Sequence, residues 1–155
     1  MAHESLLIEN QICFRIYSLE RAIQQAYKPL LDDLGITYPQ YLVLLVLWEK
    51  KEVTVGQLCE VLGLDTGTIS PLVKRMEKKG LVTRNRLPSD ERTVLISLSG
   101  EGVKLEEKAR SIPRGLGKCL FGNLKEEQVE KAYAHLRSVL DDTLKAVRNS
   151  CIPKE

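Results

Sequence analysis

Residues 54–98 decide the fold of this chain, with the sequence TVGQLCEVLGLDTGTISPLVKRMEKKGLVTRNRLPSDERTVLISL. Thr54 and Gln57 have the spacing of a capping box, in which each side chain bonds a free backbone N–H of the first helical turn. Gly63 follows at the distance of a residue that ends a helix. The segment therefore begins with one short helix.

A second helix is expected directly after the first. Asp65 can cap its start, and Gly80 ends it after Lys79. Pro71 lies inside this helix and is tolerated best in or near the first turn, where its missing N–H costs little. Two short helices joined by a tight turn predict a helix-turn-helix unit.

Two strands complete the segment. Alternating residues predict strands over Val82–Leu87 and Val94–Leu98, joined by the loop Pro88–Thr93. In a helix-turn-helix with such a wing, one helix enters the major groove of DNA and the hairpin reaches the flanking backbone or minor groove. The expected fold class is mainly α (α+β), a winged helix-turn-helix with N- and C-terminal dimerisation helices.

The charge of the chain is concentrated in this segment. The net charge is only +2, yet residues 66–92 hold seven basic and three acidic side chains, while other acidic residues gather in 101–107 and 126–142. A basic face on a nearly neutral body favours reversible binding to the phosphates of double-stranded DNA. A solvated helix face remains the alternative for any single cluster, and a winged helix used for protein contacts is the alternative for the whole segment.

The candidate DNA-binding residues divide by position. Short hydroxyl side chains at the start of the second helix suit base edges, and basic side chains about two turns later suit phosphates. An arginine at the tip of the wing suits a narrow minor groove. In chain order the candidates are Thr66, Thr68, Ser70, Lys74, Arg75, Arg84, Arg86 and the wing-tip Arg92.

The N-terminal part of the chain predicts two further helices. The first is expected over 5–28 and ends before Pro29, and the second begins near Pro39, at a position that favours proline. The first helix carries an apolar stripe that we expect to be buried. Its members are Ile12, Ile16, Leu19, Ile23, Ala26 and Leu30.

The C-terminal part predicts two more helices. Ser99 is expected to cap a helix that runs to about Ser111, and a last helix is expected over 125–148. A break between them is expected at Pro113, Gly115 and Gly117.

The terminal helices have more apolar surface than a small winged domain can cover. A homodimer would bury that surface and would place two recognition helices one DNA turn apart. We therefore expect a helical dimerisation region formed by residues 1–38 and 111–155, and a winged helix-turn-helix region over residues 39–110.

Targeting and cofactor signals are missing from the sequence. The N-terminus has no basic segment before an apolar run, and the longest apolar run, Tyr41–Trp48, is too short to span a bilayer. We expect a cytoplasmic protein without a membrane partner. The cysteines, at positions 13, 59, 119 and 151, lack metal-binding spacing, so we expect no metal and no cofactor.

The order of helices, the segment LDTGTISPLVKRMEKKG and the pair Asp90 and Arg92 in the wing resemble the MarR family of winged-helix regulators. The likeness extends from about Leu6 to Arg148. It implies a homodimer that binds a pseudo-palindromic operator, with Asp90 among the residues of the DNA-binding wing. Most such proteins repress transcription until an inducer releases them.

A narrower resemblance lies in ENQICFRIYSLERAIQQAY, followed by GITYPQY, which is similar to the organic-hydroperoxide-sensing OhrR branch. It implies that Cys13 is the oxidisable sensor and that Tyr27 and Tyr38 hydrogen-bond it across the dimer. Cys13 and Tyr27 are 14 residues apart. On one straight helix that separation is about 21 Å, so the two residues can meet only between subunits.

The implied chemistry is a thiol switch. A thiolate attacks the peroxide O–O bond and gives a sulfenic acid, which a second thiol converts to a disulfide. The resemblance favours Cys119 of the other subunit as this resolving thiol; if it is a bystander, a small-molecule thiol caps Cys13. Cys59 is expected to be packing and Cys151 incidental. Apolar neighbours of Cys13 favour an organic hydroperoxide over hydrogen peroxide as inducer.

Three other functions stay open. A MarR-type repressor could be induced by a phenolic ligand in a pocket that includes Tyr17, Tyr38 and Tyr41. A thiol peroxidase would use the same cysteine chemistry, but the sequence has no peroxidase-type active-site motif, so we expect no enzyme. A broader thiol-based stress or virulence regulator would use the same switch at more promoters.

Overall fold

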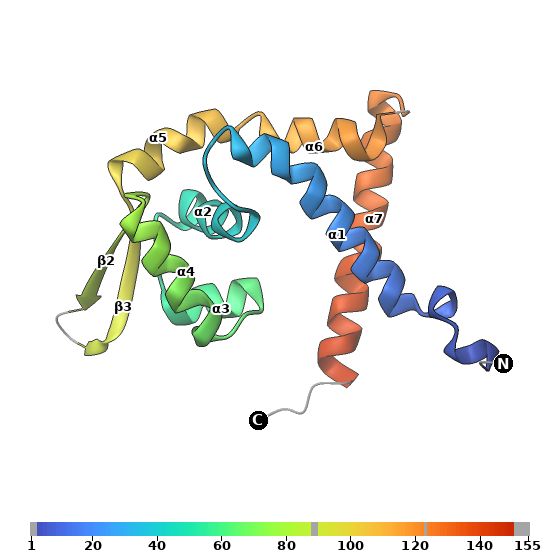
Figure 1. The fold of residues 1–155 in the computed structure, drawn as a ribbon, viewed down its shortest axis with the longest axis horizontal. Coiled ribbons are helices and arrows are strands. Elements are labelled where there is room, and N and C mark those ends of the chain that lie inside the picture. Colours follow the sequence, from blue (N-terminus) through green and yellow to red (C-terminus); the bar gives the residue numbers. More distant parts are fainter. Residues whose placement is uncertain (1–2, 88–89, 123, 151–155) are drawn as a thin grey trace. The chain divides into compact units, whose positions relative to one another are not determined.

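The computed structural model of the chain describes residues 3–87, 90–122 and 124–150; the side chains of residues 87, 90–92, 126 and 150 lie outside that description. The chain divides into two compact units, residues 1–113 and 114–155. The first unit contains two short 3-10 turns, Glu4–Leu6 and Ile8–Asn10, followed by the helices and strands drawn in Figure 1. In chain order these are α1 (Ile12–Asp32), α2 (Tyr38–Lys50), β1 (Glu52–Thr54), α3 (Val55–Leu62), α4 (Thr66–Lys78), β2 (Val82–Leu87), β3 (Asp90–Leu98) and α5 (Gly100–Ala109).

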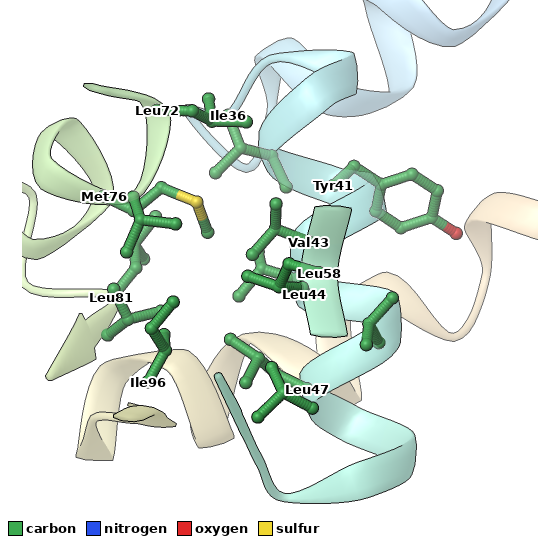
Figure 2. Close-up of a cluster of buried hydrophobic side chains, with 14 of the residues drawn as sticks. Ile36, Tyr41, Val43, Leu44, Leu47, Leu58, Leu72, Met76, Leu81 and Ile96 are labelled. Atoms are coloured by element: carbon green, nitrogen blue, oxygen red, sulfur yellow. The ribbon is translucent and has the colours of Figure 1, made fainter. Parts of the chain in front are cut away.

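Helix α2 is the centre of the core. Val43, Leu44 and Leu47 have no exposed surface, and Tyr41 is 1% exposed. A helix that is apolar on nearly every side must be covered by its neighbours. Figure 2 shows how side chains from α3, α4 and the sheet surround it, with Leu58, Met76 and Ile96 among them.

The predicted helix-turn-helix is confirmed. Thr54 and Gln57 form the capping box, with N···O distances of 3.2 and 2.8 Å. Gly63 ends α3 with φ +64°, a left-handed conformation that favours glycine. The Asp65 carboxylate accepts a bond of 2.8 Å from the Thr68 N–H and caps α4, and Gly80 follows α4 with φ +72°.

Pro71 is the sixth residue of α4, beyond the first turn, and the helix is continuous through it. The ring is exposed, while its neighbours Ile69, Leu72 and Val73 are buried. Burial of those side chains stabilises the helix by more than the loss of one hydrogen bond weakens it.

The wing belongs to a three-stranded antiparallel sheet with the order β1-β3-β2. Strand β1 was not predicted, because three residues are too few to show an alternating pattern; its Val53 pairs with Ile96 of β3. The prediction that β3 begins at Val94 was wrong. The strand begins at Asp90, which pairs with Leu87, so residues 90–93 of the predicted loop belong to β3, and the register shifts between Arg86 and Leu87.

The predicted first helix was wrong at its N-terminal end. Glu4–Leu6 and Ile8–Asn10 form 3-10 turns, and α1 begins only at Ile12. The side-chain amides of Asn10 and Gln11 donate to the carbonyls of Glu4 and Ser5, at 3.0 and 2.7 Å. These bonds compete with regular helical hydrogen bonds.

The predicted end of this helix was also wrong, because α1 continues through Pro29 to Asp32. A proline inside a helix costs about 3 kcal/mol. Beyond it, Leu31 is only 2% exposed, and burying one leucine contributes about 1.5–3 kcal/mol. Leu30 and Leu34 also pack against the core, so tertiary burial offsets the proline. Gly35, with φ +64°, lies in the turn that follows the helix.

The C-terminal helices are α5, α6 (Ile112–Phe121) and α7 (Glu126–Ser150). Ser99 caps α5 as predicted, accepting a 3.0 Å bond from the Gly102 N–H. The predicted break at residues 113–117 was wrong, because α6 spans it. Pro113 is the second residue of α6, where its missing N–H has no partner to lose.

Candidate sensor site and nucleic-acid interface

The first turn of α4 presents two of the predicted hydroxyl side chains. Thr66 and Thr68 are exposed, whereas Ser70 is half-buried. The Thr68 hydroxyl donates to Asp65 at 3.2 Å, and the Thr66 hydroxyl lies 3.8 Å from the sulfur of Cys59. Because the Asp65 carboxylate already caps this end of α4, the exposed hydroxyl groups are what suit a base edge or a phosphate here.

The basic residues of α4 differ in what they contact. Lys74 and Arg75 are exposed, on a helix whose opposite face is buried in the core. Lys79, which follows α4, donates to the carbonyl of Gly35 at 2.9 Å and to the side-chain oxygen of Gln40 at 3.4 Å. Lys74 and Arg75 are therefore open to phosphates, while Lys79 joins α4 to the turn between α1 and α2.

The two described arginines of the wing also differ. Arg86 is exposed on β2, but Arg84 is half-buried and forms an ion pair of 3.3 Å with Glu77 of α4. Glu77 had no role in the sequence prediction, because nothing local marks a pair separated by seven residues and a turn. Asp90 and Arg92 lie on β3 with side chains outside the described part, so their DNA-binding role stays a prediction.

The structure brings the predicted sensor tyrosines together. The ring centroids of Tyr27 on α1 and Tyr38 on α2 are 4.9 Å apart. Tyr41 extends the cluster, 5.6 Å from Tyr27 and 6.2 Å from Trp48. The Trp48 N–H donates to the Gly102 carbonyl at 3.0 Å, which fixes the far end of this aromatic cluster.

The start of α2 holds Tyr38 in place. Thr37 and Gln40 form a second capping box, in which the Gln40 side-chain oxygen accepts a 3.1 Å bond from the Thr37 N–H. Gln40 is buried. Tyr38 is the first residue of α2 and lies between the two residues of the capping box. This capping box was not predicted, although Thr37-x-x-Gln40 has the required spacing.

Burial changes the acidity of two phenols. It raises the pKa of Tyr38, and the nearby Glu20 carboxylate raises it further. Burial also raises the pKa of Tyr41, with a further contribution from Tyr38. A phenol is protonated at neutral pH even at its ordinary pKa of about 10, and the raised pKa keeps the O–H of Tyr38 as a hydrogen-bond donor further into alkaline pH.

Cys13 lies far from the tyrosines within one chain. It is the second residue of α1 and is exposed. Because one continuous helix carries Cys13 and Tyr27, 14 positions apart, about 21 Å separates them along its axis. A single chain thus supplies the thiol and the tyrosine pair at different places.

The apolar stripe of α1 was expected to be buried and is open in the single chain. Ile12 is 75% exposed, Ile16 50% and Leu19 45%. Ile23, Ala26 and Leu30 are partly buried. The open part of the stripe lies in the same two turns as Cys13.

A groove of about 430 Å³ lies between α1 and the start of α2. Tyr17, Glu20, Arg21 and Tyr38 contribute to its lining. Tyr41 does not, because it is buried in the core, so the pocket predicted for a phenolic ligand was wrong in that residue.

The other cysteines have separate environments. Cys59 is partly buried against the core, in agreement with a packing role. Cys119 is exposed on α6, a regular helix where the sequence predicted a break, and Cys151 lies outside the described residues. Nothing in the described part of the chain groups three or more His, Cys, Asp or Glu side chains for a metal ion. Among the same residues, no helix is long and apolar enough to cross a membrane.

Known proteins resemble the chain over most of its length. Residues 25–109 match the family described as "Transcriptional regulator SarA/Rot". The chain is 51% identical over 126 residues to the organic hydroperoxide resistance transcriptional regulator of Bacillus subtilis (strain 168), a match that covers 79% of this chain and 86% of that protein.

Solved structures give the same fold. Reduced AbfR bound to DNA matches with a TM-score of 0.74 and 34% identity, over 95% of this chain and 99% of that one. AbfR has also been solved overoxidised on DNA and with a disulfide formed, with TM-scores of 0.67 and 0.63. MarR from E. coli matches with a TM-score of 0.71 and 27% identity, over 84% of this chain and 96% of that one.

The winged helix, the tyrosine pair that joins the cysteine-bearing helix α1 to α2, and these similarities agree with one another. The chain belongs to the MarR family of winged-helix transcriptional regulators, in the branch of the organic hydroperoxide resistance regulators.

Proposed function

We propose that this protein is a redox-sensing transcriptional repressor that binds operator DNA as a homodimer and leaves it when an organic hydroperoxide oxidises Cys13. The observation that carries the proposal is the 51% identity to a hydroperoxide resistance regulator, combined with the contact between Tyr27 and Tyr38. Such a regulator acts in the cytoplasm and is consumed stoichiometrically by its oxidant, so it is not an enzyme.

DNA binding is assigned to α4 and the wing. The exposed Thr66, Thr68, Lys74 and Arg75 supply hydroxyl and cationic groups along the solvent face of α4, and Arg86 supplies a cation from the wing. AbfR, which shares the fold, has been solved on DNA. Two copies of α4 in a two-fold dimer match the two halves of a pseudo-palindromic operator.

Homodimerisation is supported by the apolar surface that a single chain leaves open. The N-terminal half of α1 exposes Ile12, Ile16 and Leu19, and α7 exposes Val139, Leu140 and Leu144. Adjoining exposed apolar side chains along one helix indicate a protein interface. A dimer would cover them and would bring Cys13 of one subunit to Tyr27 and Tyr38 of the other.

The proposed reaction begins at the Cys13 sulfur. The thiolate attacks one oxygen of the hydroperoxide ROOH, an S–O bond forms as the O–O bond breaks, and the other oxygen leaves as the alcohol ROH after taking a proton. Cys13 becomes a sulfenic acid. A thiol then attacks this sulfur, an S–S bond forms and water leaves, with Cys119 of the other subunit as our candidate for that thiol.

Release of DNA follows from movement of α1. Forming a disulfide removes Cys13 from the tyrosines and shifts the helix that spaces the two subunits. Because α1 contacts α2 and α2 contacts α4, such a shift changes the distance between the recognition helices. Loss of the one-turn spacing weakens binding to the operator.

The groove of about 430 Å³ beside Tyr17 and Tyr38 favours one second candidate, a repressor induced by a bound phenolic ligand. It differs from the first in needing no thiol. Adding salicylate to the DNA complex of a Cys13→Ser protein distinguishes them, because only ligand induction would release that variant.

A gel shift on the promoter upstream of the protein's own gene tests the main proposal. We expect cumene hydroperoxide to release the wild type and a dithiol to restore binding. A Cys13→Ser protein should bind and ignore the oxidant, while Cys59→Ser serves as a matched control and behaves as wild type. Release of Cys13→Ser by the oxidant would contradict the proposal.

A separate experiment tests the resolving thiol. Oxidised wild type should migrate as a covalent dimer on a non-reducing gel, and Cys119→Ser should not. A Cys119→Ser protein that still forms a reversible intersubunit disulfide would assign the role to another thiol.

A further inference from the structure

An ion pair joins the wing to the recognition helix. The guanidinium of Arg84 on β2 lies 3.3 Å from the carboxylate of Glu77 in the last turn of α4. Both side chains are partly enclosed, with exposures of 27% and 40%. Arg84 pairs across the sheet with Ile96, which is fully buried, so its backbone is anchored in the centre of the hairpin.

Arg84 and Arg86 lie on the same strand, two residues apart, yet their surroundings differ. Arg86 is exposed, whereas Arg84 is half-buried and its Nε has no hydrogen-bond partner among the described residues. A partly buried guanidinium with one unbonded N–H loses hydration that a single ion pair only partly replaces, so this pair contributes little net stability. In some proteins, ionic groups that add little stability instead fix one arrangement of the elements they join.

We infer that Arg84 is a positioning residue and not a phosphate ligand: its ion pair with Glu77 fixes the direction in which the wing leaves α4. This inference rests on the proposed DNA binding. A winged helix must place α4 in the major groove and the hairpin on the flanking DNA at the same time. Their relative orientation therefore decides whether both contacts form.

Because Glu77 is negatively charged, the direction in which its substitution changes DNA affinity tests the inference. A carboxylate close to a DNA-binding face repels phosphates, so removing its charge should strengthen binding if Glu77 has no other role. If Glu77 holds Arg84, the same substitution frees the wing and weakens binding. The two accounts predict opposite changes.

Fluorescence anisotropy of a labelled operator measures the affinity of the full-length variants Glu77→Gln, Arg84→Gln and Arg86→Gln. The titrations run at salt concentrations from about 50 to about 200 mM, the range in which phosphate contacts show their salt dependence. We expect Glu77→Gln and Arg84→Gln each to weaken binding by about tenfold, a coupling typical of contacting residues. The salt dependence should stay that of the wild type. Arg86→Gln is the matched control, and it should reduce the slope of log K against log salt by about 1, as loss of a phosphate contact does.

Two further variants and one DNA-free readout complete the test. The double variant Glu77→Gln/Arg84→Gln should bind no more weakly than either single variant, and the exchanged pair Glu77→Arg/Arg84→Glu should recover part of the loss. In the free protein, amide hydrogen exchange of β2 and β3 should accelerate in Glu77→Gln and Arg84→Gln but not in Arg86→Gln.

Tighter or unchanged operator binding by Glu77→Gln, or a slope reduced by about 1 in Arg84→Gln, would overturn the inference. Unchanged hydrogen exchange in both variants would overturn it as well, whether or not the protein binds the operator. A wild type that fails to bind the operator would instead overturn the proposed function.

Discussion

The rings of Tyr27 and Tyr38 lie with their centroids 4.9 Å apart, although they belong to different helices. The capping box at Thr37 and Gln40 fixes the helix start that carries Tyr38. Each chain thus contains a preassembled tyrosine pair, and its own Cys13 lies about 21 Å from Tyr27 along α1. In our account, a dimer completes the sensor.

Removing the phenol groups should slow the sensor. In the proposed dimer, Tyr27→Phe/Tyr38→Phe takes two hydrogen-bond donors from the Cys13 sulfur, and a hydrogen bond to a charged group contributes about 1.5–3 kcal/mol. We expect Cys13 oxidation by cumene hydroperoxide to slow by about tenfold or more in stopped-flow measurements. Tyr133→Phe, on α7, is the control. If oxidation slowed equally in this control, the role proposed for Tyr27 and Tyr38 would be contradicted.

The open stripe of α1 should determine the oligomeric state. Ile16→Glu places a charge where an apolar contact is proposed, and burying an isoleucine contributes about 1.5–3 kcal/mol per copy. We expect sedimentation velocity to show monomers at micromolar concentration. Ser18 lies on α1 outside the stripe, so the control protein Ser18→Glu should remain dimeric. A dimeric Ile16→Glu protein would place the interface elsewhere.

Gly102 should be required for packing. A Cβ at this position would lie 2.1 Å from the backbone oxygen of Leu81, so the α5 backbone would have to shift. We expect Gly102→Ala to lower the free energy of unfolding by about 1–3 kcal/mol. Gly100→Ala, where nothing lies within 4 Å, should be neutral or slightly stabilising. Urea denaturation of both variants measures the difference, and equal stabilities would contradict the packing.

Alkaline pH should destabilise the protein through two phenols. Burial raises the pKa of Tyr38 and of Tyr41 above the ordinary value of about 10, which the unfolded chain keeps. The contribution of the two phenols to the free energy of unfolding is complete below pH about 10. It decreases as the pH rises toward the folded pKa values, because the unfolded state then binds fewer protons than the folded state. Urea denaturation at several pH values should show this decrease, and Tyr38→Phe/Tyr41→Phe should reduce it. An equally steep decrease in the double variant would contradict the assignment.

The sequence predicted the features that depend on local pattern. The caps at Thr54 and Asp65 and the glycine ends at Gly63 and Gly80 were correct, because each is determined by a few neighbouring residues. The features that depend on distant contacts were missed. Helix α1 continues through Pro29 because residues beyond it pack against the core.

The same distinction applies to the site. Cys13, Tyr27 and Tyr38 could be named from resemblance, but the contact between Tyr27 and Tyr38 depends on how α1 packs against α2. Arg84 was predicted to bind DNA from its charge alone. Its partner Glu77 comes from the far side of a turn, which only the folded chain reveals.

Mixed dimers test the central claim, that one subunit's Cys13 reacts beside the other subunit's tyrosines. One subunit carries Cys13→Ser, and the other carries Tyr27→Phe/Tyr38→Phe, so the single Cys13 faces intact tyrosines only across the interface. We predict that this cysteine is oxidised by cumene hydroperoxide at the wild-type rate, measured by mass spectrometry of quenched samples. A rate as slow as that of the pure Tyr27→Phe/Tyr38→Phe dimer would contradict the account.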